Sequence, residues 1–202
     1  MIYCDLDNVL IDSLRLAKRQ QDATEALGVP QALYEETARI VMKEFGYYSP
    51  QNHHAVLARH LTIGEAFVHK IIECAEEGGI VFPDVHDFLF NFDRSILAIL
   101  TSGDPEFQML KIQANDLDAY FSRIHVTIGH KADSLDAPSN EDFFLDDAPR
   151  EIEKMKLRHP QMFCIQLRQP PFWETQKTTT YADARAIDLL EAAEIIRRQR
   201  SM

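Results

Sequence analysis

Residues 1–13 read MIYCDLDNVLIDS, and this stretch decides how the rest of the chain is interpreted. An apolar run, Met1 to Cys4, leads directly into two aspartates, Asp5 and Asp7, with one leucine between them. Side chains two residues apart on a strand point to the same side of the sheet, roughly 6–7 Å apart. Two carboxylates at that spacing repel each other. The stretch therefore predicts a strand whose carboxyl end delivers both groups to a functional site.

Four further short runs are almost continuously apolar, which is typical of strands buried on both faces of a parallel sheet. They are SILAIL at 95–100, RIHVTI at 123–128, DFFL at 142–145 and MFCIQL at 162–167. Helical spacing of apolar residues separates or follows these runs. It links Val85, Phe88, Leu89 and Phe92, and later Ala186, Leu189, Leu190, Ala193 and Ile196. Strands that alternate with helices predict an α/β protein with a Rossmann-like parallel sheet.

Residues 13–79 interrupt this alternation, because they contain no strand pattern and several helix boundary signals. These predict four helices: one capped by Ser13 that runs to Gly28, one that begins at Pro30, one that begins at Ser49-Pro50, and one with a Thr62/Glu65 capping box that ends at Gly78-Gly79. We therefore predict a core formed by residues 1–12 and 80–202, with a helical insert at 13–79. The chain shows no internal repeat.

Composition excludes several classes of partner. The 202 residues are 46% hydrophobic and carry 21 Lys and Arg against 32 Asp and Glu, a net charge of -11. That balance disfavours nucleic acid or an anionic membrane as the main partner. The sequence has no signal-peptide pattern and no apolar stretch of spanning length, and its three cysteines are far apart. We expect reduced thiols and a cytoplasmic location.

Polar residues follow the other predicted strands where each one ends. Thr101, Ser102 and Gly103 follow the second run, Lys131 lies in GHKAD after the third, and Asp146-Asp147 follow the fourth. The carboxyl ends of parallel strands meet at one edge, so four carboxylates, a hydroxyl and an ammonium are expected together there. Hard oxygen ligands of this kind suit Mg²⁺.

In this order, DLDNV, TSG, the lysine of GHKAD, and LDD resemble the motifs of the haloacid dehalogenase-like (HAD) hydrolase superfamily, and they span most of the chain. The helical insert after the first strand resembles the C1-type cap of that superfamily. The resemblance implies a Mg²⁺-dependent phosphatase that acts on a small phosphorylated molecule. Asp5 would be the nucleophile and Asp7 the general acid and base, with its backbone carbonyl at the metal.

The resemblance also implies roles for the remaining motif residues. Thr101 and the N–H groups of Ser102 and Gly103 would hold phosphoryl oxygens, and Lys131 would neutralise charge and orient Asp5. Asp146 would complete the metal shell that contains Asp5 and Asp7, with Asp147 supporting it. Two departures stand out: Asn8 occupies a position where glycine is common, and Ala follows Lys131 in place of Pro. Lys111 is a rival site lysine, interpreted here as a solvated residue of a helix.

Other interpretations remain beside this one. A phosphonatase would need a Schiff-base lysine, and the insert offers only Lys18, Lys43 and Lys70. Dehalogenation is disfavoured by the resemblance, which associates it with loss of the second aspartate. A non-enzymatic phosphometabolite-binding protein is the third class. Four insert residues, Tyr47, Tyr48, His53 and His54, are interpreted as packing residues rather than substrate contacts, and Phe172 and Trp173 as part of a packed loop.

Overall fold

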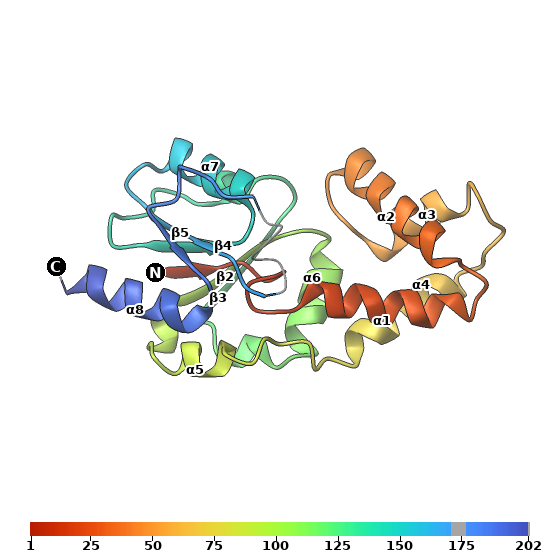
Figure 1. Ribbon diagram of the computed structural model, residues 1–202, viewed down its shortest axis with the longest axis horizontal. Helices are drawn as coiled ribbons and strands as arrows, with labels where there is room; N and C mark the ends of the chain where they lie inside the picture. Colours follow the sequence, from red (N-terminus) through yellow and green to blue (C-terminus); the bar gives the residue numbers. More distant parts are fainter. Residues whose placement is uncertain (171–176, 202) are drawn as a thin grey trace.

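A computed structural model describes residues 1–170 and 177–201; the aromatic pair Phe172 and Trp173 lies outside the described residues. Figure 1 shows two lobes, a sheet flanked by helices and a separate group of helices next to it. The polypeptide passes from the first strand directly into the second lobe. Within the described residues, no helix combines the length and the apolar character needed to cross a membrane.

In the described part of the chain, six strands form one parallel sheet in the order β3-β2-β1-β4-β5-β6. Their bounds are β1 Ile2–Cys4, β2 Leu97–Ser102, β3 Arg123–Thr127, β4 Phe143–Asp146, β5 Phe163–Leu167 and β6 Ala184–Ala186. The five apolar runs are confirmed as strands. The sixth strand was not predicted, and Ala186, which was assigned to the last helix, belongs to it. That edge strand is three residues long with Arg185 at its centre, so it leaves no apolar run in the sequence.

The central strand β1 contributes apolar side chains to both faces of the sheet. Ile2 pairs with Leu97 of β2 on one side and with Phe143 of β4 on the other. Ile2 and Cys4 belong to one apolar cluster, whereas Tyr3 belongs to a second. Side chains alternate across a strand, so the two clusters lie on opposite faces. Both faces are therefore buried, as the continuous apolar runs predicted.

Helices cover these two faces. The cluster around Ile2 takes residues from α5 Val85–Leu89, α6 Pro105–Gln113 and α8 Leu189–Arg200, and the cluster around Tyr3 takes residues from α7 Pro149–Arg158. In the part of the chain that the structure describes, three short 3₁₀ helices connect elements: η1 Arg94–Ile96, η2 Leu117–Ala119 and η3 Lys131–Ser134. Pro105 and Pro149 open α6 and α7 at the first helical position, where a missing N–H costs nothing.

The helical insert contains the four predicted helices: α1 Ser13–Glu25, α2 Gln31–Phe45, α3 Pro50–Leu57 and α4 Ala66–Glu76. Two predicted caps are wrong. Asp12, not Ser13, caps α1 by accepting a hydrogen bond from Arg15 N at 3.0 Å, because the Ser13 hydroxyl is used elsewhere. No capping box forms at Thr62, since Glu65 is the N-cap of α4 and makes no side-chain cap bond. Ser49 caps α3 as predicted.

The return from the insert to the core passes close to the end of α6. Gly78 has a φ of +58°, and a Cβ at this position would lie 2.1 Å from the carbonyl oxygen of Ala114. Arg19 of α1 donates to the carbonyl oxygens of Cys74 and Gly78 at 3.0 Å each. The backbone of Ile80 donates to the side chain of Asn115 at 3.1 Å. The chain therefore enters the core at a closely packed junction between α1, α4 and α6.

Candidate active site

Three carboxylates converge at the carboxyl edge of the sheet. Asp5 follows β1, and its backbone N–H donates to Leu145 O at 2.9 Å, which holds it beside the end of β4. Asp146 ends β4, and Asp147 follows it. One carboxylate oxygen from each of the three lies within 4.8 Å of the others. Asp5 and Asp146 are buried, so the repulsion between them is poorly screened by water.

Lys131 is the cation inside this cluster. Its Nζ lies 2.7 Å from Asp5 Oδ1 and 2.6 Å from Asp146 Oδ2, and the residue is buried. Burial works against the charge of this ammonium, but the carboxylates of Asp146 and Asp5 raise the pKa of Lys131 above its usual value. The structure thus brings Lys131 to the place that the sequence predicted for it, although Ala132 follows it in place of a proline.

The cluster still carries a surplus of negative charge, with three carboxylates around one lysine. Burial and then Asp146 raise the pKa of Asp147 to about 7. Asn8 adopts a left-handed φ of 61°, which asparagine tolerates, and its amide nitrogen lies 3.4 Å from Asp147 Oδ2. Among the described residues, no partner reaches the buried Oδ1 of Asn8. Hard carboxylate oxygens, excess charge and an unsatisfied amide oxygen fit a Mg²⁺ ion.

Asp7 is held apart from this cluster by its own set of donors. Its carboxylate accepts hydrogen bonds from Ser13 Oγ at 2.6 Å and Gln108 Nε2 at 3.0 Å. Lys111 Nζ lies 2.6 and 2.7 Å from its two oxygens. Burial opposes the charge of Asp7, but the charge and hydrogen bond of Lys111, with those of Ser13 and Gln108, lower its pKa. The predicted pair Asp5 and Asp7 therefore divides, with one carboxylate in the acidic cluster and one paired to Lys111.

The interpretation of Lys111 as a solvated residue is wrong. The side chain is buried, with 6% of its surface exposed, and it lies on the face of α6 that meets Asp7. Gln108 shares this face three residues earlier and is also buried. Lys111 Nζ lies 5.4 Å from the ring centroid of Phe107, close enough for a cation–π contact. The site consequently contains two lysines, of which Lys131 meets Asp5 and Lys111 meets Asp7.

The residues predicted to hold phosphate lie at the end of β2. Thr101 is buried, and its Oγ1 accepts a hydrogen bond from Gln108 Nε2 at 2.7 Å. Ser102 Oγ donates to Gly129 O at 2.8 Å. The N–H of Gly103 donates to Thr127 O at 3.0 Å, so in this structure that group extends the contact with β3 and does not face an open site. The Thr101 hydroxyl and the Asp7 carboxylate share one hydrogen-bond donor, the amide nitrogen of Gln108.

Comparison with solved structures gives matches along almost the whole chain. A haloacid dehalogenase-like hydrolase of Burkholderia xenovorans matches with a TM-score of 0.77 at 19% identity, over 98% of this chain and 96% of that one. A HAD-hydrolase of Bacillus subtilis, bound to magnesium, gives 0.71 at 15% identity, over 96% and 97%. The L-2-haloacid dehalogenase of Xanthobacter autotrophicus, with chloropropionic acid covalently bound, gives 0.66 at 14% identity, over 100% and 98%.

The chain has the haloacid dehalogenase-like (HAD) fold. The resemblance seen in its four motifs is thereby confirmed at the level of the fold. No family profile and no curated protein matches the sequence. At these identities the similarity concerns the fold, and the chemistry has to be argued from the residues of the site.

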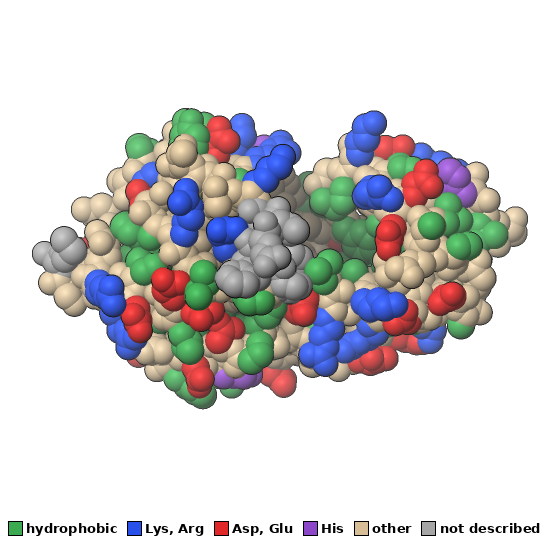
Figure 2. Space-filling view, in the orientation of Figure 1, with side chains coloured by type: hydrophobic (Ala, Val, Ile, Leu, Met, Phe, Trp, Pro, Cys, Tyr) green, Lys and Arg blue, Asp and Glu red, His purple; other side chains and the backbone are tan. Residues whose placement is uncertain are grey.

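In this HAD fold, the aromatic and histidine residues of the insert pack largely as predicted. His53 is fully buried, with one ring nitrogen 2.9 Å from Thr37 Oγ1 and the other 3.0 Å from Tyr48 Oη. Burial lowers the pKa of His53 to about 4, which keeps the ring neutral. The Tyr48 ring lies 5.8 Å from that of Phe107 in α6, so it also joins the insert to the core near Lys111. Figure 2 shows a hollow between the two lobes, with hydrophobic side chains on the insert side.

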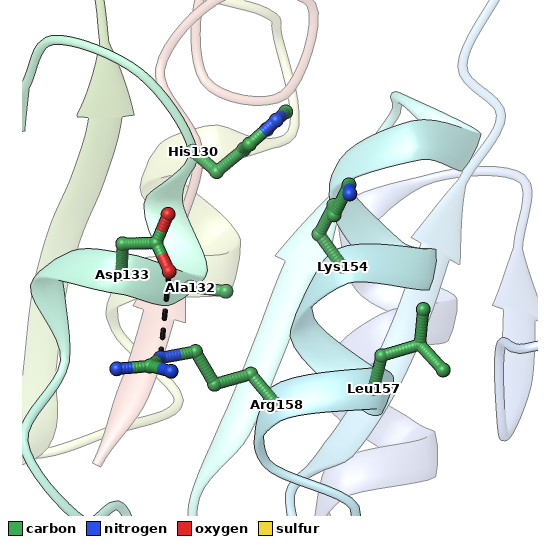
Figure 3. A pocket seen from close by; sticks show the side chains of 6 residues that line it. All are labelled: His130, Ala132, Asp133, Lys154, Leu157 and Arg158. Carbon is green, nitrogen blue, oxygen red and sulfur yellow. Dashed lines mark ion pairs between the residues drawn. The ribbon is translucent and has the colours of Figure 1, made fainter.

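A separate pocket of about 440 Å³ lies beside the acidic cluster rather than in it. Figure 3 shows His130, Ala132 and Asp133 on one wall and Lys154, Leu157 and Arg158 of α7 on the other, with an ion pair between Asp133 and Arg158 at 3.4 Å. None of these six residues belongs to the acidic cluster. The pocket adjoins η3, whose first residue is Lys131.

Proposed function

We propose that this protein is a Mg²⁺-dependent phosphatase that hydrolyses a small phosphomonoester through an aspartyl-phosphate on Asp5. The observation that carries the proposal is the convergence of Asp5, Asp146 and Asp147 around Lys131, with a surplus of negative charge that a divalent cation would balance. Asp7, which is held separately by Lys111, is a fourth carboxylate at the same edge of the sheet. This division suits a reaction that needs both a nucleophile and a proton-transfer group.

Asp5, Asp146 and Asp147 would hold the cation, together with the backbone carbonyl of Asp7. Bound there, Mg²⁺ would offset the charge that otherwise repels a phosphate dianion. A carboxylate oxygen of Asp5 attacks phosphorus as the bond to the leaving oxygen breaks, and the leaving oxygen takes a proton from the acid form of Asp7. Lys131 orients that carboxylate, and the Thr101 hydroxyl donates to a phosphoryl oxygen. Water then attacks phosphorus, and its proton passes to Asp7 as Asp5 is released.

The lowered pKa of Asp7 suits hydrolysis of the aspartyl-phosphate better than its formation. An ionised carboxylate is ready to accept the proton of water, whereas protonation of a leaving oxygen needs the acid form. We therefore expect substrates whose leaving groups need little protonation, such as aryl phosphates, to react fastest. The rates of phosphate release from a panel of sugar phosphates, nucleotides and aryl phosphates test this order. The physiological substrate is expected to be a small phosphorylated metabolite that contacts the insert.

The alternatives fit the site less well. Two of the three insert lysines are engaged in ion pairs on the exposed surface, Lys18 with Asp22 and Lys70 with Glu73, and neither belongs to the site. That disfavours a Schiff-base phosphonatase. Dehalogenation is disfavoured because Asp7 is present and held by four polar contacts. A protein that only binds phosphometabolites does not need both Asp5 and Asp7.

The test is phosphate release from an aryl phosphate with Mg²⁺ and with chelator. We expect turnover only with Mg²⁺, loss of turnover in Asp5→Asn, and residual turnover in Asp7→Asn, since general acid–base catalysis contributes roughly 10²- to 10⁴-fold. Rapid quenching of Asp7→Asn with labelled substrate should trap label on the peptide that contains Asp5. Asp136→Asn, at an exposed loop aspartate, is the matched control and should behave as wild type. Equal turnover with chelator, or full activity of Asp5→Asn, would refute the proposal.

A further inference from the structure

We propose that Gln108 is a positioning residue that turns the Thr101 hydroxyl into a hydrogen-bond donor for the phosphoryl group. The inference rests on the proposed phosphatase function and adds a residue that none of the four motifs contains. Gln108 is buried, and its amide nitrogen lies 2.7 Å from Thr101 Oγ1, 3.0 Å from Asp7 Oδ2 and 3.2 Å from Ser102 O. It therefore touches both the predicted proton-transfer carboxylate and the predicted phosphate ligand.

The chemistry of these partners fixes the orientation of the Gln108 amide. The carbonyl oxygen of Ser102 can only accept a hydrogen bond, so the group that faces it must be the NH₂ and not the oxygen, and the same NH₂ then donates to Asp7 Oδ2. An amide nitrogen donates and does not accept. The hydroxyl of Thr101, 2.7 Å from the same nitrogen, is consequently an acceptor in this contact.

A threonine hydroxyl carries one hydrogen, and the contact with Gln108 leaves that hydrogen unused. Over the described residues, Thr101 Oγ1 makes no further hydrogen bond, although the residue is 1% exposed. A buried hydroxyl with an unused hydrogen is poised to donate to an incoming acceptor. A phosphoryl oxygen at the carboxyl edge of the sheet is such an acceptor. Without Gln108, no described hydrogen bond would fix the direction of the hydroxyl hydrogen.

The local backbone explains how Gln108 reaches this position. Asp104 caps α6 by accepting from Phe107 N at 2.9 Å, and Gln108 N donates to Asp104 O at 2.8 Å in the first turn. Side chains of a helix lean toward its N-terminus, so Gln108 lies back over the loop after β2. At Gly103 a Cβ would lie 3.0 Å from Cγ and Cδ of Gln108. Glycine at this position leaves the space that the Gln108 side chain fills.

The decisive experiment is a double-mutant cycle between Gln108→Met and Thr101→Val. Met has a similar length and cannot donate, and Val keeps the shape of Thr without the hydroxyl. The readouts are KM and kcat on an aryl phosphate with Mg²⁺, and the inhibition constant of inorganic phosphate. We expect Gln108→Met to weaken phosphate inhibition roughly tenfold, the usual effect of one hydrogen bond to a charged group. In the Thr101→Val background, the same change should have at most a small further effect on that constant.

Gln108→Glu provides a second arm, because its carboxylate would accept the Thr101 hydrogen and withdraw it from phosphate. We expect it to weaken phosphate inhibition more than Gln108→Met does. Gln113→Met, at an exposed position of the same helix, is the matched control and should bind phosphate as wild type does. Thermal unfolding of each variant identifies any that do not fold, and the comparison then rests on the others.

The outcomes separate the two proposals. If wild type neither hydrolyses phosphomonoesters nor binds inorganic phosphate, the proposed function is wrong and this inference falls with it. If wild type is active but Gln108→Met and Gln113→Met have the same phosphate inhibition constant, the role of Gln108 alone is overturned. Fully additive effects of Gln108→Met and Thr101→Val would also overturn it, because Gln108 would then not act through the hydroxyl.

Discussion

Lys131 and Lys111 each neutralise a different aspartate of the opening DLD stretch. Lys131 lies between Asp5 and Asp146, and Lys111 contacts both oxygens of Asp7. Two buried ammonium groups thus allow two carboxylates two residues apart to coexist at one strand end. Since each pairing is separate, replacing one lysine should affect one aspartate far more than the other.

Replacing Lys111 by Met should destabilise the protein, because it leaves Asp7 without its cation in a largely buried position. The Asp7 side chain is 31% exposed, so water compensates for part of the loss. We expect a decrease of about 1–3 kcal/mol in the free energy of unfolding, measured with urea. Lys154→Met, at an exposed position of α7, is the control. Equal midpoints for the two variants would show that the Lys111–Asp7 pair contributes little to stability.

The raised pKa of Asp147 predicts a pH dependence of the metal-free protein. A carboxyl whose pKa is about 7 when folded and near 4 when unfolded binds its proton more tightly in the folded state. Its contribution to stability is therefore present below pH 4 and is lost as the pH rises toward 7. We expect Asp147→Asn to flatten this part of the stability profile in chelator. Mg²⁺ should restore stability near pH 7 by binding the ionised form; an unchanged profile would contradict this account.

Site residues at strand ends were predictable, whereas those on the helix after β2 were not. Asp5, Thr101 and Asp146 each close an apolar run, and parallel strands bring their ends together. Gln108 and Lys111 share a helix face, but helical spacing does not tell which surface that face meets. Polar residues on a short helix are ordinarily solvated, so the sequence alone favoured the wrong interpretation of Lys111.

At the scale of elements, apolar runs in the sequence predicted β1 to β5, and helix boundary residues predicted the four helices of the insert. The predictions that failed concern single residues and one short edge strand. Asp12 and Ser13 are both residue types that commonly cap helices. Because the Ser13 hydroxyl donates to Asp7, Asp12 is the residue that caps α1. The edge strand β6 is held by pairing with β5 rather than by its own composition. Such choices depend on contacts between distant parts of the chain.

The junction at Gly78 should be intolerant of any side chain. Its φ of +58° and the 2.1 Å approach of a Cβ to Ala114 O combine backbone strain with a clash against main chain, which cannot move aside cheaply. We expect Gly78→Ala to cost more than about 3 kcal/mol of stability. Gly79→Ala is the matched comparison, because φ is +66° but no atom lies within 4 Å, and it should cost only about 1–2 kcal/mol. Thermal unfolding of both variants measures the difference.

At the scale of the whole molecule, the described strands all lie outside residues 13–79, so the sheet does not need the insert for pairing. The apolar cluster on one face nevertheless continues from Ile2 into the insert, where it includes Leu16, Phe67 and Ile71. We expect a variant with 13–79 replaced by a short linker to fold cooperatively but with lower stability, and to change its substrate preference. Circular dichroism during urea unfolding tests the first point; a non-cooperative transition would contradict the proposed boundary.

The central place of β1 has a consequence for the order in which the protein assembles during synthesis. Strand β1 leaves the ribosome before its two neighbours, β2 and β4, whose partner residues begin at Leu97 and Phe143. At about 5–20 residues per second, β1 waits on the order of ten seconds before its second neighbour exists. Until then, an apolar segment has both edges unpaired, which invites association with chaperones or other nascent chains. The helices of the insert, built from local contacts, are free to form during this interval.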